Sequence, residues 1–111
     1  MEVMAAETVD ARTAAEMVRA GDTIIDVRTS SEYARGHVSG AINIPIDMIA
    51  GADLPPGQLI TTCTMGGRAG RAADLLHAMG RIAFSIRGGT TMWENARLPI
   101  VLGPEPGPRQ R

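Results

Sequence analysis

The stretch LITTCTMGGRAGRAADLLHAMG, residues 59–80, joins a short β-branched run to a helix through a glycine-rich loop. Leu59–Thr62 has the composition of a buried parallel strand. From Gly67 to Met79, alanine and leucine recur on one helical face, and Gly80 is placed to end the helix. Cys63 lies at the carboxyl end of the predicted strand. Ligands of open α/β sheets bind outside the carboxyl ends of the strands, so we expect a functional site in this loop.

Short strands and helices alternate before and after this stretch. Strands are expected at 23–27, 41–44 and 82–86, and helices at 11–20, 31–35, 47–50 and 91–97. Asp10 is the expected cap of the first helix, and Ser30 or Ser31 that of the second. Strands alternating with helices over this length predict an α/β domain with a central, mostly parallel sheet.

The 111 residues fit a single domain. We expect that domain at 9–103, after an N-terminal tail at 1–8. Residues 104–111 alternate glycine, proline and charge, which neither a helix nor a strand accommodates. A disordered C-terminal tail is therefore expected there.

Composition excludes several classes of protein. A net charge of −1 argues against a nucleic-acid-binding protein, which usually carries a concentrated basic face. A single cysteine excludes an intramolecular disulfide, a dithiol redox pair and a cysteine-rich zinc site. The two histidines are far apart in the chain, so no metal-ligand spacing exists. Without a signal peptide or a run of about 20 apolar residues, we expect a cytoplasmic protein with no membrane partner.

The loop after the third predicted strand combines a thiol with groups that bind anions. A helix N-terminus stabilises the thiolate form of Cys63 through its dipole and its free N–H groups. Gly66 and Gly67 let the backbone curl with its amides inward, and Arg68 can hold two oxygens of a sulfonate or phosphate. A lone cysteine is most often a buried apolar residue, and an arginine on a first helical turn is usually solvated. The order of the four residues nevertheless favours an activated thiolate beside an anion cradle.

Several further short segments, before and after this loop, form a pattern of fixed order and spacing together with it. They are Ile25-Asp26-Val27-Arg28 with Glu32-Tyr33, Gly36-His37-Val38, Gly40-Ala41-Ile42-Asn43-Ile44-Pro45, and Gly88-Gly89 with Trp93 and Leu98-Pro99. With Cys63, Gly66 and Arg68 as a Cys-x-x-Gly-x-Arg loop, the chain resembles the single-domain rhodanese-like sulfurtransferases. The resemblance covers nearly the whole predicted domain and implies a three-layer α/β/α fold.

The resemblance implies a reaction at Cys63. Its thiolate attacks the outer sulfur of thiosulfate or another persulfide donor, holds that sulfur as a persulfide, and passes it to cyanide, a thiol or a protein acceptor. Such two-step nucleophilic catalysis needs no metal or organic cofactor. The implied substrate-binding residues are those of the loop: Thr64, Met65, Gly66, Gly67 and Arg68. Arg68 either orients the donor's sulfonate or holds the loop in shape.

Four residues outside the loop have two interpretations each. Asp26 and Arg28 are more simply an ion pair that pins the neighbouring loop than an acid–base pair. His37 is a base for Cys63 or, the preferred interpretation, a turn histidine with both nitrogens satisfied. Arg87 precedes a loop that should approach the site in this fold, so it either steers anionic donors or is a surface arginine.

Loop length and composition narrow the chemistry further. Phosphatases of this fold place their arginine six residues after the cysteine, whereas Arg68 is fifth and Ala69 sixth, so a phosphatase is disfavoured. Loops of the family that this chain resembles often carry a more polar residue in place of Met65. We expect Met65 to favour a small organic thiol or a protein acceptor over cyanide. A persulfide carrier without turnover has the same loop as an enzyme, so both remain open. The presence of Cys63 weakens a third alternative, a regulatory interaction module.

Overall fold

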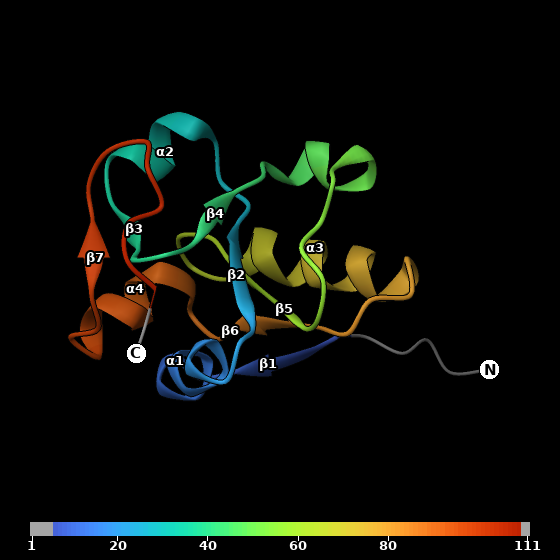
Figure 1. The fold of residues 1–111 in the computed structure, drawn as a ribbon, viewed down its shortest axis with the longest axis horizontal. Coiled ribbons are helices and arrows are strands. Elements are labelled where there is room, and N and C mark those ends of the chain that lie inside the picture. Colours follow the sequence, from blue (N-terminus) through green and yellow to red (C-terminus); the bar gives the residue numbers. More distant parts are fainter. Residues whose placement is uncertain (1–5, 110–111) are drawn as a thin grey trace.

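The computed structural model describes residues 6–109, in which short strands alternate with helices (Figure 1). In chain order the elements are β1 (Glu7–Val9), α1 (Ala11–Arg19), β2 (Thr23–Asp26), α2 (Ser30–Ala34), β3 (His37–Val38), β4 (Ile42–Asn43), the 3-10 helix η1 (Ile46–Gly51), β5 (Leu59–Thr62), α3 (Gly67–Ala78), β6 (Ala83–Ile86), α4 (Gly89–Asn95) and β7 (Ile100–Val101). The predicted strand Leu59–Thr62 is found with the same bounds, and the other predicted elements differ at their ends by one or two residues.

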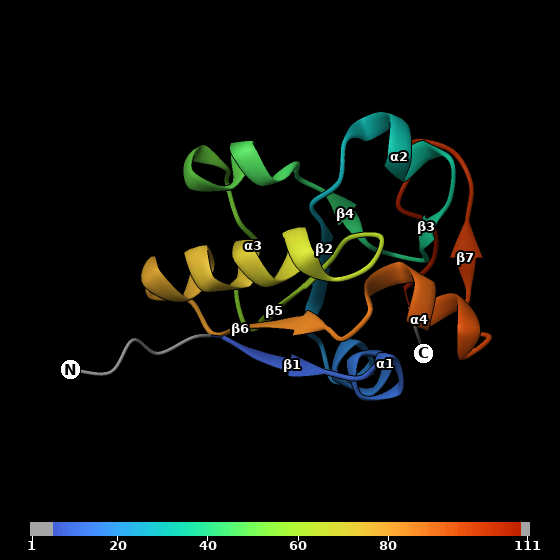
Figure 2. The same ribbon diagram turned by 180° about the vertical axis from the view of Figure 1, so that it is seen from behind.

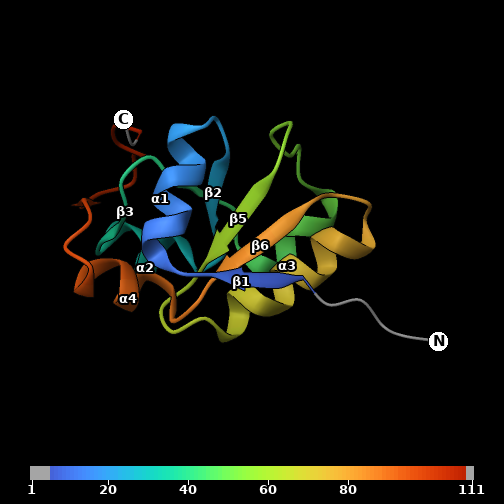
Figure 3. The ribbon, with the colours of Figure 1, turned by 90° about the horizontal axis from the view of Figure 1, so that it is seen from below.

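A five-stranded sheet forms the middle layer, in the order β1-β6-β5-β2-β4, and every strand pair in it is parallel. Helix α1 lies on one face, and α3 with η1 lies on the other (Figure 3). The predicted α/β/α architecture around a parallel sheet is confirmed. No helix among residues 6–109 is long and apolar enough to span a membrane.

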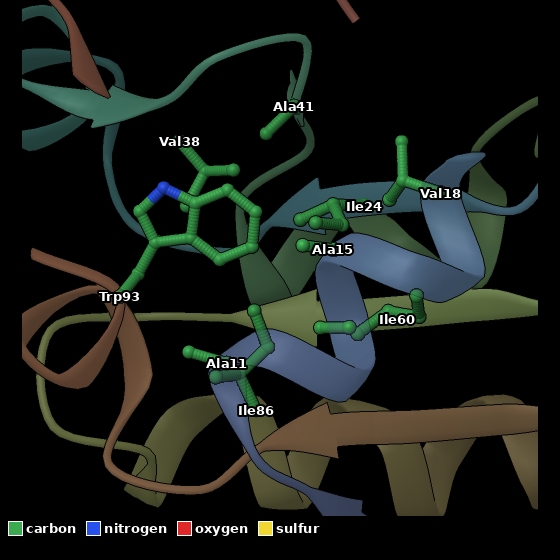
Figure 4. Packing of buried hydrophobic residues seen from close by; sticks show 10 residues of the cluster. Ala11, Ala15, Val18, Ile24, Val38, Ala41, Ile60, Ile86 and Trp93 are labelled. Carbon is green, nitrogen blue, oxygen red and sulfur yellow. The ribbon is translucent and has the colours of Figure 1, made fainter. Parts of the chain in front are cut away.

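Side chains of the central strands alternate between the two faces, as a strand period of two requires. Ile24 and Ile60 pack against α1 in one apolar cluster, whereas Ile25 and Leu59 pack against α3 in another. The fully buried Trp93 from α4 closes the first cluster (Figure 4). Because strands buried on both faces are rich in β-branched and apolar residues, the sequence pattern identified β2 and β5 well.

The N-terminal prediction is wrong where the structure describes it. Residues 7 and 8 belong to β1, which pairs in parallel with β6 at the edge of the sheet, rather than to a tail. The strand has only three residues, with two exposed side chains, and so lacks the apolar pattern by which strands are identified. Residues 1–5 of the predicted tail lie outside the described part of the chain.

The disordered tail expected from residue 104 is also wrong for residues 104–109. This segment has no regular secondary structure, but Pro106 O accepts a hydrogen bond from Gly40 N at 2.7 Å, and Pro108 O accepts one from Ser39 Oγ at 2.5 Å. The Arg109 guanidinium donates to Asp22 O at 2.7 Å. Prolines still accept through their carbonyls, so a segment unfit for helix or strand is held by the body of the fold.

A second small sheet was not predicted. It pairs β3 with β7 in antiparallel fashion, and it lies with α2 at one end of the molecule (Figures 1 and 2). Each strand has only two residues, too few for any alternation to be recognised in the sequence.

Candidate active site

Cys63 directly follows β5, and its side chain is only 2% exposed. Its Sγ accepts hydrogen bonds from Gly66 N at 3.0 Å and from Ala69 N at 3.3 Å. Gly66 caps α3 with φ +106°, a conformation that glycine adopts without strain. The turn therefore brings the N-terminus of α3 onto the sulfur.

Backbone N–H groups at the start of a helix have no partner within the helix and favour negative charge. Two of them point at Sγ, so the loop is suited to an anionic sulfur. The sequence predicted a loop that curls at Gly66 and Gly67 with its amides inward, and the Gly66 amide does donate to Sγ. Ala69 was missed, although its place in the first turn of a well-predicted helix was a usable signal.

Helix α4 supports the loop from behind. Thr90 N donates to Cys63 O at 2.7 Å and Thr91 N to Thr64 O at 3.1 Å. A Cβ on Gly89 would lie 2.5 Å from Cys63 O, so only glycine fits there. Figure 2 shows the loop between β5 and α3 beside the start of α4. The Gly88-Gly89 pair thus has a specific role, which is to let α4 approach the backbone of the cysteine loop.

Arg68 forms a bidentate ion pair with Glu32 of α2. Its Nη1 donates to Oε1 at 2.7 Å and its Nη2 to Oε2 at 2.9 Å. This hydrogen bonding lowers the pKa of Glu32 to about 2 and raises the pKa of Arg68 above its ordinary value. In this arrangement Arg68 ties the first turn of α3 to α2. The role of Glu32 was not predicted, although the residue belongs to a segment that carried the family resemblance.

Glu32 is itself held by the start of its own helix. Thr29 caps α2 by accepting from Glu32 N, and the Glu32 carboxylate accepts from Thr29 N at 3.1 Å. The predicted caps Ser30 and Ser31 are therefore wrong, since this reciprocal capping box begins at Thr29.

Asp26 and Arg28 form a second ion pair, which is buried. Arg28 Nη2 donates to Asp26 Oδ2 at 2.7 Å and also to Gly36 O at 2.8 Å. The Asp26 carboxylate further accepts from the backbone N–H of Arg28. The pair thus fastens the segment between β2 and α2 to Gly36, the second residue after α2, in line with the ion-pair interpretation.

His37 is fully buried, with both ring nitrogens next to carbonyl oxygens. Nδ1 lies 2.9 Å from Tyr33 O, and Nε2 lies 3.2 Å from Pro106 O. The ring stacks on Tyr33 with 3.6 Å between centroids, and burial raises the pKa of that tyrosine to about 12. Neither nitrogen is bonded to Cys63, so this geometry holds no Cys–His dyad.

The remaining candidates lie on the surface. Thr64, Met65 and Gly67 are exposed along the loop, and Thr91 Oγ1 donates to Met65 Sδ at 3.7 Å. Arg87 is exposed as well, but its guanidinium donates to Thr8 Oγ1 of β1 at 3.3 Å and lines a hollow between α1 and α4. The structure thus brings together Cys63, Gly66, Ala69 and the Arg68–Glu32 pair, and places Arg87 in a neighbouring site.

Metal ligands do not gather in the described part of the chain. Among residues 6–109, no three histidine, cysteine, aspartate or glutamate side chains lie close enough together to hold an ion.

Comparison with known proteins places the site in a family context. The family described as "Rhodanese-like domain" matches residues 9–96. Thiosulfate sulfurtransferase 16, chloroplastic, from Arabidopsis thaliana is 33% identical over 108 residues, which cover 83% of this chain and 90% of that protein. Protein HIGH ARSENIC CONTENT 1, mitochondrial, from the same plant is 33% identical over 106 residues, 81% of this chain but only 63% of that protein. The crystal structure of a rhodanese-related protein from Thermoplasma volcanium superposes with a TM-score of 0.80 at 27% identity, covering 86% of this chain and 98% of the other.

Proposed function

The chain belongs to the rhodanese-like domain family, and from this premise we propose that it transfers sulfane sulfur through a persulfide on Cys63. The observation that carries the proposal is the pair of backbone N–H groups, from Gly66 and Ala69, that donate to Sγ. The name of the Arabidopsis thiosulfate sulfurtransferase supports the same class of reaction.

The first step is attack on a sulfur donor such as thiosulfate. The Cys63 thiolate bonds to the outer sulfur, the S–S bond of thiosulfate breaks, and its electron pair leaves with sulfite. The product is an anionic Cys63 persulfide. Amides already aimed at Sγ cost no reorganisation when charge moves to the adjacent sulfur, which is the advantage of a preorganised anion site.

The second step returns the enzyme to its starting state. An acceptor nucleophile, either cyanide or a thiolate, attacks the outer sulfur of the persulfide. The electron pair of the broken S–S bond returns to Cys63 as a thiolate, and the acceptor leaves as thiocyanate or a persulfide. No metal or organic cofactor takes part in either step of this nucleophilic mechanism.

Arg68 acts in this proposal mainly by shaping the loop. Both of its terminal nitrogens are occupied by Glu32, so the guanidinium already has a bidentate carboxylate partner. The remaining loop residues with substrate contact are Thr64, Met65, Gly66 and Gly67. Because the reaction needs a free thiol, we place it in a reducing compartment such as the cytoplasm.

The experiment is mass spectrometry of the protein after thiosulfate treatment and gel filtration. Wild type should gain the mass of one sulfur atom, and Cys63→Ala should gain none. A matched control is Cys63→Ala/Met79→Cys, which places a thiol at an exposed position on the other end of α3. This control should stay unmodified, because its sulfur lacks the two amides. Uptake by the control at the wild-type level, or none by wild type, overturns the proposal.

Turnover separates an enzyme from a carrier. Steady formation of thiocyanate from thiosulfate and cyanide supports an enzyme. Persulfide formation on Cys63 without turnover instead supports the carrier alternative, in which a dedicated protein takes the sulfur. A chain that takes up no sulfur is left with the interaction-module alternative.

A further inference from the structure

A hollow of about 340 Å³ lies between the N-terminus of α1, the end of β6 and α4. Its apolar lining consists of Ala11 from α1 with Met92 and Ala96 from α4. Small-molecule sites in proteins have volumes of this order, and combine an apolar lining with a few polar groups that fix orientation. None of the residues 63–69 lines it, so the hollow is a separate feature from the cysteine loop.

Positive charge dominates the polar rim of the hollow. Arg12 and Arg87 are both exposed, and each guanidinium donates a long hydrogen bond to a neutral oxygen of the described chain: Arg12 to Ala96 O at 3.3 Å, and Arg87 to Thr8 Oγ1 at 3.3 Å. The one carboxylate on the rim, Asp10, accepts from Thr13 N at 2.8 Å as the cap of α1. That bond, with a smaller contribution from Arg87, lowers the pKa of Asp10. Two guanidinium groups therefore line the hollow, and neither forms an ion pair with a carboxylate of residues 6–109.

The hollow and the cysteine loop share one wall. On one side, a Cβ on Gly66 would lie 3.3 Å from Gly88 N, so the loop packs against the start of α4. On the other side, the Met92 side chain lies directly over Gly88, since a Cβ there would meet Met92 Cγ at 2.1 Å. The backbone of Gly88 thus lies between the cysteine loop and Met92, which lines the hollow.

We propose that this hollow binds the anionic end of the sulfur acceptor, and that the acceptor class is a low-molecular-weight thiol carrying a carboxylate. The inference rests on the proposed function, because it assigns a substrate to the second step. The carboxylate binds Arg12 and Arg87, the stem lies on Met92 and Ala96, and the thiol reaches over the first turn of α4 to the persulfide on Cys63.

The chemistry of that step is fully balanced. The acceptor thiolate attacks the outer sulfur of the Cys63 persulfide, and a new S–S bond forms on the acceptor. The old S–S bond breaks, and its electron pair returns to Cys63 as the thiolate. One negative charge enters with the acceptor and one leaves with its persulfide, so no oxidant, reductant or additional proton is needed.

The test uses glutathione, a peptide-sized thiol with two carboxylates, and its diethyl ester, in which both carboxylates are neutralised. Thiosulfate is the donor in both cases, and the measured quantity is the ratio of kcat/KM for glutathione to that for the ester. In wild type we expect this ratio to be about tenfold or more, corresponding to two partly exposed charge contacts. In Arg12→Gln/Arg87→Gln the ratio should fall towards one.

A matched control is Arg19→Gln, at the other end of α1 and equally exposed. It removes one positive charge from the protein without touching the hollow, so the ratio should stay at the wild-type value. An equal fall in the control would show that only overall charge matters, and would overturn the subsite. A ratio near one in wild type also overturns the subsite, and this measurement does not depend on the folding of any variant.

Failure of the subsite is distinguishable from failure of the proposed function. Wild type that forms the Cys63 persulfide but transfers sulfur equally to both thiols contradicts only the subsite. Wild type that takes up no sulfur from thiosulfate contradicts the proposed function itself.

Discussion

Two arginine–carboxylate pairs with the same shortest N–O distance, 2.7 Å, lie in very different surroundings. The side chains of Arg28 and Asp26 are 8% and 0% exposed, whereas those of Arg68 and Glu32 are 32% and 25% exposed. Breaking a buried pair leaves an uncompensated charge in the interior, but a pair open to solvent contributes less to stability. The buried pair is therefore suited to holding the fold together, and the partly exposed pair to positioning the cysteine loop.

The two ion pairs are connected through helix α2. Arg28 fastens the segment before α2 to Gly36 after it, which sets the position of that short helix. Glu32 on α2 then holds Arg68 in the first turn of α3, next to the N–H of Ala69 that donates to Cys63 Sγ. Changes at the first pair should thus be seen in stability, and changes at the second in activity.

The largest effect is expected from Asp26→Asn, which keeps the shape of the side chain but leaves the Arg28 charge unpaired in the interior. The free energy of unfolding should fall by about 3–5 kcal/mol, measured by urea denaturation. Asp53→Asn, an exposed aspartate, is the control and should change stability by less than about 0.5 kcal/mol. A loss below about 1 kcal/mol for Asp26→Asn would remove the distinction between the two pairs.

A smaller and different effect is expected from Glu32→Gln. Glutamine keeps the capping box with Thr29 but loses the charge that binds Arg68. Stability should fall by less than about 1 kcal/mol. The rate of persulfide formation should fall about tenfold, since a small displacement of the first turn of α3 misaligns the amides at Sγ.

The kinetic constants of Glu32→Gln separate two roles for Arg68. A lower kcat with little change in the KM for thiosulfate supports loop positioning. A lower KM would mean that the released guanidinium binds the donor's sulfonate, and positioning would then be the wrong role. Glu16→Gln, an exposed glutamate on α1, is the control and should leave both constants unchanged.

The contrast between the pairs also explains what the sequence could predict. Asp26 and Arg28 are two residues apart on a recognisable strand and its exit, so their pairing was foreseeable. Glu32 and Arg68 are 36 residues apart, and no periodic pattern relates them. Their contact depends on how α2 and α3 pack, which local sequence does not encode.

The same reasoning applies to the fold. Leu59–Thr62 was predicted with its observed bounds because a strand buried on both faces carries a dense apolar pattern. Edge strand β1 and the segment 104–109 were missed because long-range hydrogen bonds hold them, and neither carries an apolar pattern long enough to be recognised. Strand β5 and the cysteine that follows it were thus predictable, whereas the long-range contacts around Cys63 were not.

Lowering the pH should weaken the partly exposed Arg68–Glu32 pair within a defined pH range. The pKa of Glu32 is lowered to about 2 in the folded protein from an ordinary value of 4.5, mainly by its hydrogen bonds with Arg68. The stabilisation is fully present above about pH 5, and it is lost as the pH falls from 4.5 towards 2. The stability difference between wild type and Glu32→Gln should therefore be constant above pH 5 and shrink below pH 4.5.

Carboxyl NMR provides a direct measurement of this titration. The Glu32 signal should titrate well below pH 4 in wild type, and at a higher pH in Arg68→Ala, in which only the hydrogen bonds from Thr29 still lower the pKa of Glu32. An ordinary midpoint in wild type would contradict the ion pair as the structure shows it.

The smallest effect is expected at Met65, which lies beyond both pairs on the exposed side of the loop. Its side chain is 71% exposed, so Met65→Ser should leave the free energy of unfolding within about 0.5 kcal/mol of wild type. A polarizable thioether offers apolar contact to the stem of an organic acceptor, and cyanide has no stem to use it. The serine variant should therefore lose about twofold to threefold in kcat/KM for glutathione relative to cyanide, a change of less than about 1 kcal/mol. Met79→Ser, on the far end of α3, is the matched control for replacing an exposed methionine, and its acceptor preference should equal that of wild type. If Met65→Ser leaves the preference unchanged, Met65 at the mouth of the loop does not select the acceptor.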